Sequence, residues 1–345
     1  MIDFSIVTFY NSINYGAVLQ AFATQTFLQN LGYSVTMYKV KDEPSTKLNL
    51  EGIAKKIFRK IHYRQFKEKR DLFTNFVATR INVSDRTNSK VFIAGSDQVW
   101  NPLKYDPDFF LRFAPEGSVK ASYAASIGLN SIPEEYNDLF RENIQNIHFY
   151  SVREKKAKEI IELFVNENIL VNIDPTLLLD GKQWEKYESP VLNLPENYIL
   201  LYILHVPKNI NAIIDWLRKE TGFKAILIDD RGYLRKIIHN DITLWNVGPE
   251  QFLYLINHAS QVITTSFHGT AFSINFKKEF YSIVNSASPS RVSNLLDMCG
   301  LKGVSDSQMS FSRMIQSYDF AEEKISRERE NSKQYFEKLI QEWEA

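Results

Sequence analysis

His268 is the residue whose type and surroundings best suit chemistry, and it lies in the segment TTSFHGTA. The segment joins a strand expected over residues 261–265 to a helix expected over 270–276, so the sequence predicts a strand-to-helix corner. A histidine there titrates near neutral pH and can serve as a general acid or base. Thr265 and Ser266 add hydroxyl groups, and Gly269 would let a ligand approach the backbone closely. The competing interpretation is a purely structural histidine.

A second polar cluster follows the short apolar strand expected over residues 91–94. Its centre is Asp97, whose carboxylate can accept hydrogen bonds from sugar hydroxyls. Four neighbours would complete a polar bowl around it: Gly95, Ser96, Gln98 and Asn101. A helix N-cap is the alternative interpretation, but one cap does not require so many polar groups.

Two further polar segments also stand where a strand is expected to end. Asn14, Tyr15 and Gly16 form a strand-to-helix corner whose free N–H groups suit an anion or a hydroxyl, although an ordinary Asn-capped loop is equally consistent. The loop is neither a Walker A loop nor a GxGxxG loop, so it does not indicate ATP or NAD. Ser151 and Arg153 follow another strand, and a guanidinium can hold a phosphate or carboxylate bidentately, although an ion pair with the next glutamate is the commoner role.

Two more cations lie in the C-terminal half. Lys278 precedes a strand expected over residues 280–284, and Arg291 precedes a helix expected over 292–298. Either side chain could reach an anion, although solvation at the surface is the ordinary role of each. No spacing of histidine, cysteine and carboxylate residues matches a metal site, so we expect neither a metal nor a cofactor.

Composition limits the classes of function. The chain has 345 residues with 41 Lys+Arg and 41 Asp+Glu, and this zero net charge gives no support for a general nucleic-acid binder. Cys299 is the only cysteine, so no internal disulfide can form, which favours a reducing compartment. The N-terminus lacks a signal-peptide pattern, and no apolar run is long enough to span a membrane. The sequence therefore predicts a cytoplasmic protein.

A basic stretch runs from Lys55 to Arg70, with eight Lys or Arg residues and one Glu. Its ordinary interpretation is a solvated helix face. The functional alternative is a patch that contacts anionic lipid, or a lipid-diphosphate-linked acceptor, at the inner face of the membrane.

The elements that must position these residues alternate between strand and helix. A strand over residues 2–9, a helix over 17–31 and a strand over 34–40 form a βαβ unit, which predicts parallel strands. The pattern loosens over residues 180–197, where Pro190 and Pro195 interrupt it, and a strand over 198–204 and a helix over 210–221 then resume the alternation.

The fold class expected is α/β, with the domain boundary in that looser stretch. Residues 1–185 would form an N-terminal Rossmann-like domain, and residues 186–315 a C-terminal Rossmann-like domain. Residues 316–345 would form a helix that packs back on the N-terminal domain. Open parallel sheets bind ligands at the carboxyl ends of their strands, so we expect the motifs to face each other across an interdomain cleft.

Taken together, six segments of the chain resemble the polysaccharide pyruvyl transferases over most of its length. They are NYGAVLQ from Asn14, GSDQVWN from Gly95, YAASIG from Tyr123, SVRE from Ser151, DPT from Asp174 and SFHGTA from Ser266. The resemblance implies a glycosyltransferase-B-like arrangement, phosphoenolpyruvate as donor and a pyruvate ketal on a glycan as product. The N-terminal domain would then bind the acceptor and the C-terminal domain the donor. Much of the family has an arginine two residues before the histidine, where this chain has Ser266.

On this resemblance we expect His268 to perform acid–base catalysis. Arg153 and Arg291 would bind the donor's phosphate and carboxylate, and Arg291 or Lys278 would supply the charge missing at position 266. Asp97, Asn14 and Tyr15 would orient the acceptor. Two alternatives stay open: a nucleotide-sugar glycosyltransferase, and a non-catalytic binder of glycans or phospho-ligands in which Ser266 marks a lost active site. The acceptor sugar and the bridged hydroxyls do not follow from the sequence.

Overall fold

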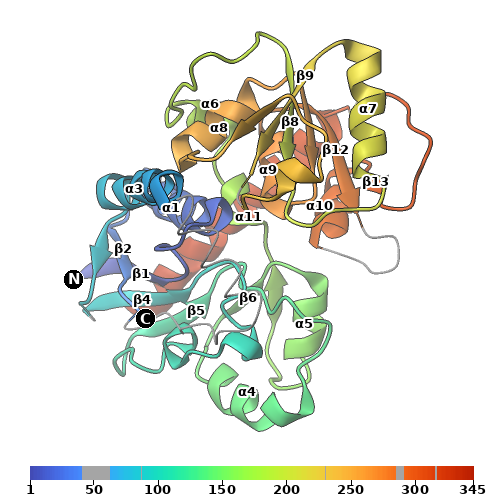
Figure 1. Ribbon diagram of the computed structural model, residues 1–345. Coiled ribbons are helices and arrows are strands. Elements are labelled where there is room, and N and C mark those ends of the chain that lie inside the picture. Colours follow the sequence, from blue (N-terminus) through green and yellow to red (C-terminus); the bar gives the residue numbers. More distant parts are fainter. Residues whose placement is uncertain (41–62, 87, 230, 285–290, 315–316) are drawn as a thin grey trace. The chain divides into compact units, whose positions relative to one another are not determined.

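The computed structural model describes residues 1–40, 63–86, 88–229, 231–284, 291–314 and 317–345 (Figure 1). The chain divides into two compact units. Among the described residues, the first unit lies within residues 1–47, 77–179 and 326–345, and the second lies within 48–76 and 180–325. Each unit has a parallel sheet and a hydrophobic core of its own.

The first unit is built on a five-stranded parallel sheet in the order β3-β2-β1-β4-β5. Its strands are β1 (Ile2–Val7), β2 (Val35–Tyr38), β3 (Val83–Ser84), β4 (Ser89–Ala94) and β5 (Val119–Ser122). A parallel pair, β6 (Tyr150–Val152) and β7 (Ile169–Val171), joins the β5 side through single bridges. Strand order reverses between β1 and β4, and open α/β sheets bind ligands at such a switch point.

The helices of the first unit follow the strands. They are α1 (Tyr15–Asn30), α4 (Asn137–Ile144) and α5 (Lys155–Ile161), with the 3₁₀ turns η1 (Pro102–Lys104), η2 (Pro107–Phe110), η3 (Glu134–Tyr136) and η4 (Pro175–Leu177). Helix α1 begins where the side chain of Asn14 accepts a hydrogen bond from the backbone N–H of Ala17, at 3.2 Å. This cap satisfies one of the N–H groups that a helix leaves open at its start.

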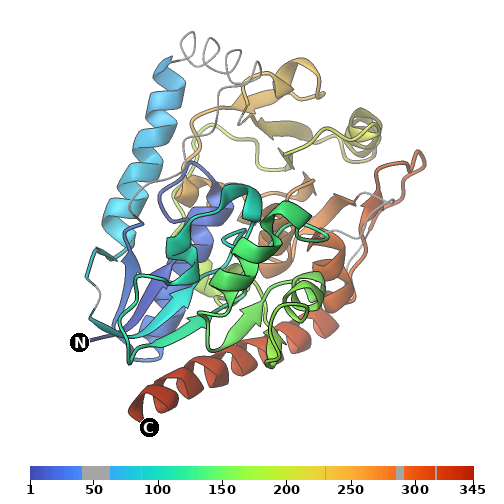
Figure 2. The same ribbon diagram turned by 90° about the horizontal axis from the view of Figure 1, so that it is seen from below.

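The long C-terminal helix α11 (Asp319–Glu344) contributes to the core of the first unit (Figure 2). Phe336 is fully buried, and its ring lies 4.6 Å from that of Tyr123 and 5.9 Å from that of Phe4. The hydroxyl of Tyr335 donates to the carbonyl of Ser122, 2.7 Å away. Aromatic burial of this kind stabilises a core strongly, so the helix is an integral part of this unit.

The second unit repeats the same architecture. Its six-stranded parallel sheet has the order β10-β9-β8-β11-β12-β13, so strand order reverses between β8 and β11. The strands are β8 (Tyr198–Tyr202), β9 (Lys224–Ile228), β10 (Ile242–Leu244), β11 (Gln261–Thr264), β12 (Glu279–Val284) and β13 (Val304–Ser305). The helices are α6 (Gly181–Glu185), α7 (Ile210–Thr221), α8 (Pro249–Asn257), α9 (Phe267–Asn275) and α10 (Arg291–Cys299), with the 3₁₀ turn η5 (Leu234–Lys236).

The boundary between units differs from the one expected after residue 185. The chain passes from the first unit to the second after residue 179. Residues 63–76 of helix α3 (Tyr63–Arg80) group with the second unit, and α11 belongs to the first unit only from Ser326 onward. A helix forms from local hydrogen bonds, whereas its grouping depends on distant contacts that leave no local mark in the sequence. In the described part of the chain, no helix is both long and apolar enough to cross a membrane.

Candidate functional site

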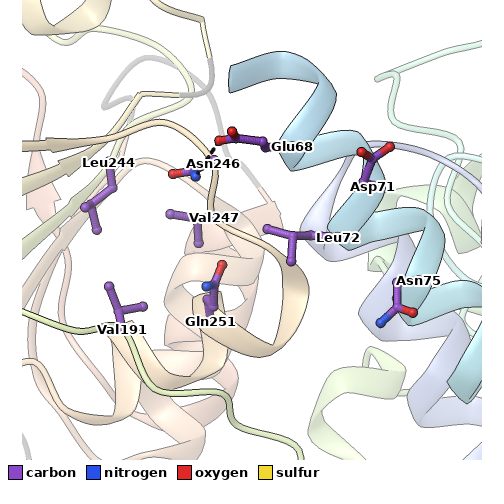
Figure 3. Close-up of a pocket in the computed structure, with 9 residues that line it drawn as sticks. All are labelled: Glu68, Asp71, Leu72, Asn75, Val191, Leu244, Asn246, Val247 and Gln251. Atoms are coloured by element: carbon purple, nitrogen blue, oxygen red, sulfur yellow. Dashed lines mark hydrogen bonds between the residues drawn. The ribbon is translucent and has the colours of Figure 1, made fainter. Parts of the chain in front are cut away.

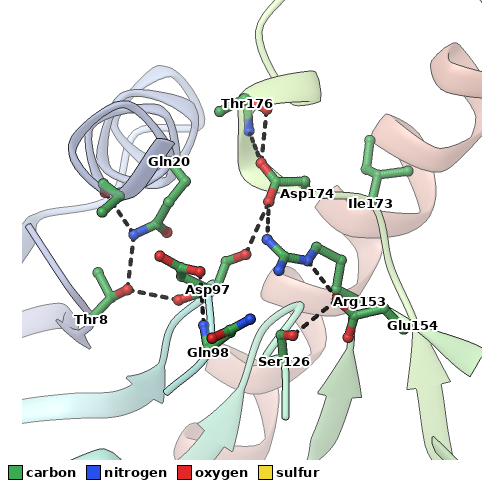
Figure 4. A network of polar contacts seen from close by, with 12 residues as sticks. Thr8, Gln20, Asp97, Gln98, Ser126, Arg153, Glu154, Ile173, Asp174 and Thr176 are labelled. Carbon is green, nitrogen blue, oxygen red and sulfur yellow. Dashed lines mark hydrogen bonds and ion pairs between the residues drawn. The ribbon is translucent and has the colours of Figure 1, made fainter. Parts of the chain in front are cut away.

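The switch point of the first unit brings two of the expected motifs together (Figure 4). After β1, the hydroxyl of Thr8 donates to the carbonyl of Ser96, 2.8 Å away in the loop after β4. The side-chain amide of Gln20, on α1, donates to the Thr8 hydroxyl at 2.9 Å. Gly95 allows this approach, because a Cβ there would lie 2.9 Å from Cβ of Thr8. The loops after β1 and β4 are therefore fastened to each other.

Asp97 has an unusual backbone conformation for a residue other than glycine. Its φ is +71°, in the left-handed region, and its backbone pairs with Ala125 as a single parallel bridge. Aspartate tolerates this region better than most residues do. One carboxylate oxygen accepts the N–H of Gln98 at 2.9 Å, and both side chains are partly exposed. The strained turn thus presents a carboxylate and an amide at the switch point.

Beneath this turn, Arg153 lies in a buried ion-pair network (Figure 4). Its Nη1 is 2.7 Å from a carboxylate oxygen of Asp174 and its Nε is 3.0 Å from one of Glu154, and its side chain is 3% exposed. Ser126 donates to Glu154 at 2.9 Å and Ser96 to Asp174 at 3.2 Å. Burial alone would lower the pKa of Arg153, but the carboxylates of Glu154, Asp174 and Asp97 outweigh burial and raise it.

The charges of this network determine which ligand the first unit can accept. One guanidinium faces three carboxylates, those of Asp97, Glu154 and Asp174. An excess of negative charge in a poorly solvated site disfavours a phosphate or carboxylate. Neutral hydroxyl groups can instead donate to the partly exposed carboxylate of Asp97. The polar turn of the first unit is therefore better suited to a neutral, hydroxyl-bearing ligand than to an anion.

The remaining expected residues of the first unit divide into exposed and buried ones. Asn14 is exposed while it caps α1, whereas Tyr15 and Gly16 are buried in the first turn of that helix. Asn101 caps η1 through the N–H of Leu103, at 3.0 Å. The buried hydroxyl of Ser151 donates to the side chain of Asn172 at 2.7 Å and accepts from the N–H of Ala124 at 3.0 Å. These bonds give Asn101 and Ser151 a role in holding the loops.

In the second unit the strand-to-helix corner after β11 begins three residues earlier than expected, at Phe267. Ser266 is the N-cap, and its hydroxyl accepts from the N–H of Gly269 at 3.3 Å. His268 is consequently the second residue of α9, 9% exposed, with its ring edge-on to Phe267 at 5.1 Å. The position at which much of the family carries an arginine is therefore a buried helix cap in this chain.

Thr265 fastens this corner to the neighbouring strand. Its hydroxyl accepts from the N–H groups of Leu204 at 2.9 Å and His205 at 3.3 Å, just beyond β8. The carboxyl ends of β8 and β11 are thereby held together, and these are the strands between which strand order reverses. The expected residues Thr265, Ser266, His268 and Gly269 thus lie at the switch point of the second unit.

Packing against Thr264 and Tyr202 is by itself sufficient to require a glycine at position 269. A Cβ at this position would lie 2.4 Å from the hydroxyl oxygen of Thr264, which is itself bonded to the carbonyl of Tyr202 at 2.7 Å. Gly269→Ala should therefore lower the free energy of unfolding by about 1–3 kcal/mol, the usual cost of overpacking. Urea denaturation measures this change. In a Thr264→Ala background the added cost should shrink, and an undiminished cost would show that the collision is not its cause.

Comparison with known proteins identifies the family of this chain. The sequence model of the polysaccharide pyruvyl transferase family matches residues 14–287. The chain belongs to the polysaccharide pyruvyl transferase family. No curated protein is significantly similar to it in sequence. The family match confirms the resemblance that the six segments indicated.

Solved structures show what the fold of this family member resembles. A putative UDP-N-acetylglucosamine 2-epimerase from Listeria monocytogenes is 11% identical, with a TM-score of 0.51, and the match covers 99% of this chain and 91% of that one. The UDP-GlcNAc 2-epimerase from Methanocaldococcus jannaschii is 13% identical, with a TM-score of 0.50, covering 95% and 92%. At such low identity the likeness concerns the fold alone. It confirms the expected α/β class with two Rossmann-like, parallel-sheet domains.

The two additional cations expected at the pyruvyl transferase site lie in different places. Lys278 precedes β12, at the amino end of the sheet, whereas His268 follows the carboxyl end of β11. The Lys278 ammonium donates to the carbonyl of Asn257, 2.7 Å away at the end of α8, and burial lowers its pKa. Arg291 is the first residue of α10 and is partly buried. The structure therefore does not bring Lys278 together with His268.

A cavity of about 500 Å³ lies elsewhere in the second unit (Figure 3). It combines two carboxylates, three amides and four aliphatic side chains: Glu68, Asp71, Asn75, Asn246, Gln251, Leu72, Val191, Leu244 and Val247. The amide of Asn246 donates to Glu68 at 3.0 Å. The described residues that line it include no lysine or arginine, so this lining offers no positive charge to an anion. Sequence reasoning missed this cavity because its residues come from α3, from β10 and the turn after it, from α8 and from the stretch before β8.

The basic stretch lies partly outside the described residues, which resume at Tyr63. Within it, Arg64 pairs with Glu68 at 2.9 Å and Lys67 pairs with Asp71 at 3.1 Å. The membrane contact stays a prediction. Across the described ranges, no group of three or more histidine, cysteine or carboxylate side chains is arranged to hold a metal ion.

Proposed function

We propose that the protein transfers the pyruvyl group of phosphoenolpyruvate to two hydroxyls of one sugar. The acceptor would belong to a bacterial surface glycan or its lipid-linked precursor. The observation that carries the proposal is the position of His268 in the first turn of α9, at the switch point of the second unit. Membership of the polysaccharide pyruvyl transferase family supports the same reaction.

The reaction requires one addition and one substitution at the same carbon. A proton adds to the methylene carbon of the enol ester, and the oxygen of the first sugar hydroxyl bonds to the neighbouring carbon and loses its proton. The oxygen of the second hydroxyl then bonds to that carbon as the C–O bond to phosphate breaks. Inorganic phosphate leaves, and the second hydroxyl proton is released. The product is a cyclic ketal that carries a methyl and a carboxylate group.

The division of charge between the units suggests how the substrates are bound. His268 is the group positioned for acid–base work, and the N–H dipoles at the start of α9 favour a developing negative charge. In the first unit, Asp97 and Gln98 would bind acceptor hydroxyls, with Asn14 at the exposed end of α1. Arg153, buried between Glu154 and Asp174, would position that turn through Ser96 and Ser126.

Ligand-induced thermal stabilisation tests this proposal. Phosphoenolpyruvate at a hundred times its Kd should stabilise the folded protein by about 2.7 kcal/mol, which raises the melting temperature by several degrees. UDP-sugars and inorganic phosphate serve as parallel ligands. A shift with a UDP-sugar but none with phosphoenolpyruvate would favour a nucleotide-sugar glycosyltransferase. Stabilisation by phosphoenolpyruvate without phosphate release in the presence of glycan acceptors would favour a non-catalytic binder.

A further inference from the structure

The carboxyl ends of β8 and β9 carry two basic side chains, an imidazole and a guanidinium, that no sequence motif pointed to. They are His205, directly beyond β8, and Arg231, in the loop after β9. We infer that Arg231 and His205 form a binding site for a phosphate or carboxylate group. In the proposed reaction, on which this assignment rests, that group belongs to phosphoenolpyruvate.

The guanidinium of Arg231 is anchored on two sides. Nη2 donates to the carbonyl of Leu204, and Nη1 donates to the hydroxyl of Tyr233 at 3.0 Å. The loop after β9 thereby reaches the end of β8, one strand nearer to the switch point. A guanidinium has five N–H donors, and these bonds use two of them. An exposed arginine that is already oriented loses little conformational entropy when its planar fork binds an anion.

A buried carboxylate fixes the backbone from which Arg231 projects. Asp229 is 2% exposed, and one of its oxygens accepts from the N–H groups of Arg231 at 3.1 Å and Gly232 at 2.6 Å. Its other oxygen accepts from the N–H of Arg235 at 3.2 Å. Because its charge is already bound by these N–H groups, Asp229 acts by positioning the backbone of Arg231.

His205 is joined to the corner that carries His268. Its N–H donates to the hydroxyl oxygen of Thr265 and its carbonyl accepts from the same hydroxyl, both at 3.3 Å. Burial, and after it the charge of Arg231, lowers the pKa of the His205 imidazole, and the carboxylate of Asp306 opposes this shift. The backbone of His205 is thus fastened to the residue before the N-cap of α9, and the charge of Arg231 acts on its imidazole.

The position in the sheet indicates an anionic ligand. Strand β8 is hydrogen-bonded to both β9 and β11, and strand order reverses between β8 and β11. Ligands bind at such a reversal, and the α9 N-terminus adds partial positive charge there. The guanidinium fork matches a phosphate or a carboxylate bidentately. In the first unit, by contrast, three carboxylates surround the single guanidinium of Arg153, which disfavours an anionic ligand.

The test compares Arg231→Gln with Arg235→Gln. Arg235 is an exposed arginine of the same loop, and its guanidinium stacks on Trp245 at 4.4 Å, so both variants remove one positive charge. We expect Arg231→Gln to weaken phosphoenolpyruvate binding about ten- to hundredfold, and Arg235→Gln to change it by less than about twofold. Titration calorimetry with phosphoenolpyruvate and, separately, with inorganic phosphate gives the Kd values. Unfolding curves of both variants verify that each is folded.

The outcomes separate this inference from the proposed function. If the wild-type protein binds phosphoenolpyruvate and the two variants bind it equally well, the Arg231 site is overturned and the proposed function stands. If the wild-type protein binds inorganic phosphate in an Arg231-dependent manner but does not bind phosphoenolpyruvate, the anion site stands and the proposed donor is wrong. Binding of neither ligand by the wild-type protein would overturn both.

Discussion

His268→Gln should lower kcat by about 10²–10⁴-fold while the protein stays folded. The histidine is the second residue of α9, nine-tenths buried at the strand-to-helix corner, and glutamine has a similar size. Glutamine can form hydrogen bonds but cannot exchange a proton near neutral pH, so the variant keeps positioning and loses acid–base catalysis. Phosphate release from phosphoenolpyruvate in the presence of acceptor measures the rate.

The matched control for this result is His239→Gln. His239 belongs to the same unit but is half exposed, and its imidazole pairs with Asp215 at 2.8 Å. We expect its kcat to stay within about twofold of the wild-type value, since surface substitutions seldom have large effects. Wild-type turnover in His268→Gln would exclude His268 from the chemical step. A matching loss in both variants would point to instability instead of chemistry.

The alternation of elements in the sequence was sufficient to predict the fold class, because strands and helices have different hydrophobic periods. The helix predicted over residues 210–221 coincides with α7. The start of α9 was predicted at Thr270, but the helix begins at Phe267 because the Ser266 hydroxyl accepts from Gly269. Strands β3 and β13 were missed, since runs of two residues show no period.

The sequence could predict the candidate site only where the residues that lie together belong to one short motif. Asp97 with Gln98, and Ser266 with His268, are close in sequence and follow the ends of strands, as the sequence predicted. Arg153 pairs with Asp174, which lies 21 positions further along the chain, and no local sequence signature links these two residues. The anchoring of Arg231 on Leu204 likewise depends on the order of strands in the sheet. Strand order follows from tertiary packing and cannot be derived from the period of one strand.

Arg153→Met should lower the free energy of unfolding of the first unit by about 3–5 kcal/mol. The substitution keeps a long side chain but leaves the carboxylates of Glu154 and Asp174 buried without their counter-charge. Urea denaturation followed by circular dichroism measures the change. The control is Arg112→Met in the same unit, where an exposed guanidinium pairs with Glu142 at 3.4 Å. An exposed pair contributes about 0–1 kcal/mol, so comparable losses in both variants would contradict the burial argument.

Arg153 could contact the donor directly or position the turn that presents Asp97, and the variant Arg153→Lys distinguishes these two roles. A guanidinium that contacts the donor would, once replaced by a point charge, raise the Kd for phosphoenolpyruvate about tenfold or more. The structure favours positioning instead, because the side chain is 3% exposed and bonded to two carboxylates. We therefore expect Arg153→Lys to keep the Kd for phosphoenolpyruvate within about threefold and to raise the KM for the acceptor, since the turn that presents Asp97 depends on this network. A weakened donor with an unchanged acceptor KM would instead place Arg153 at the phosphate or the carboxylate.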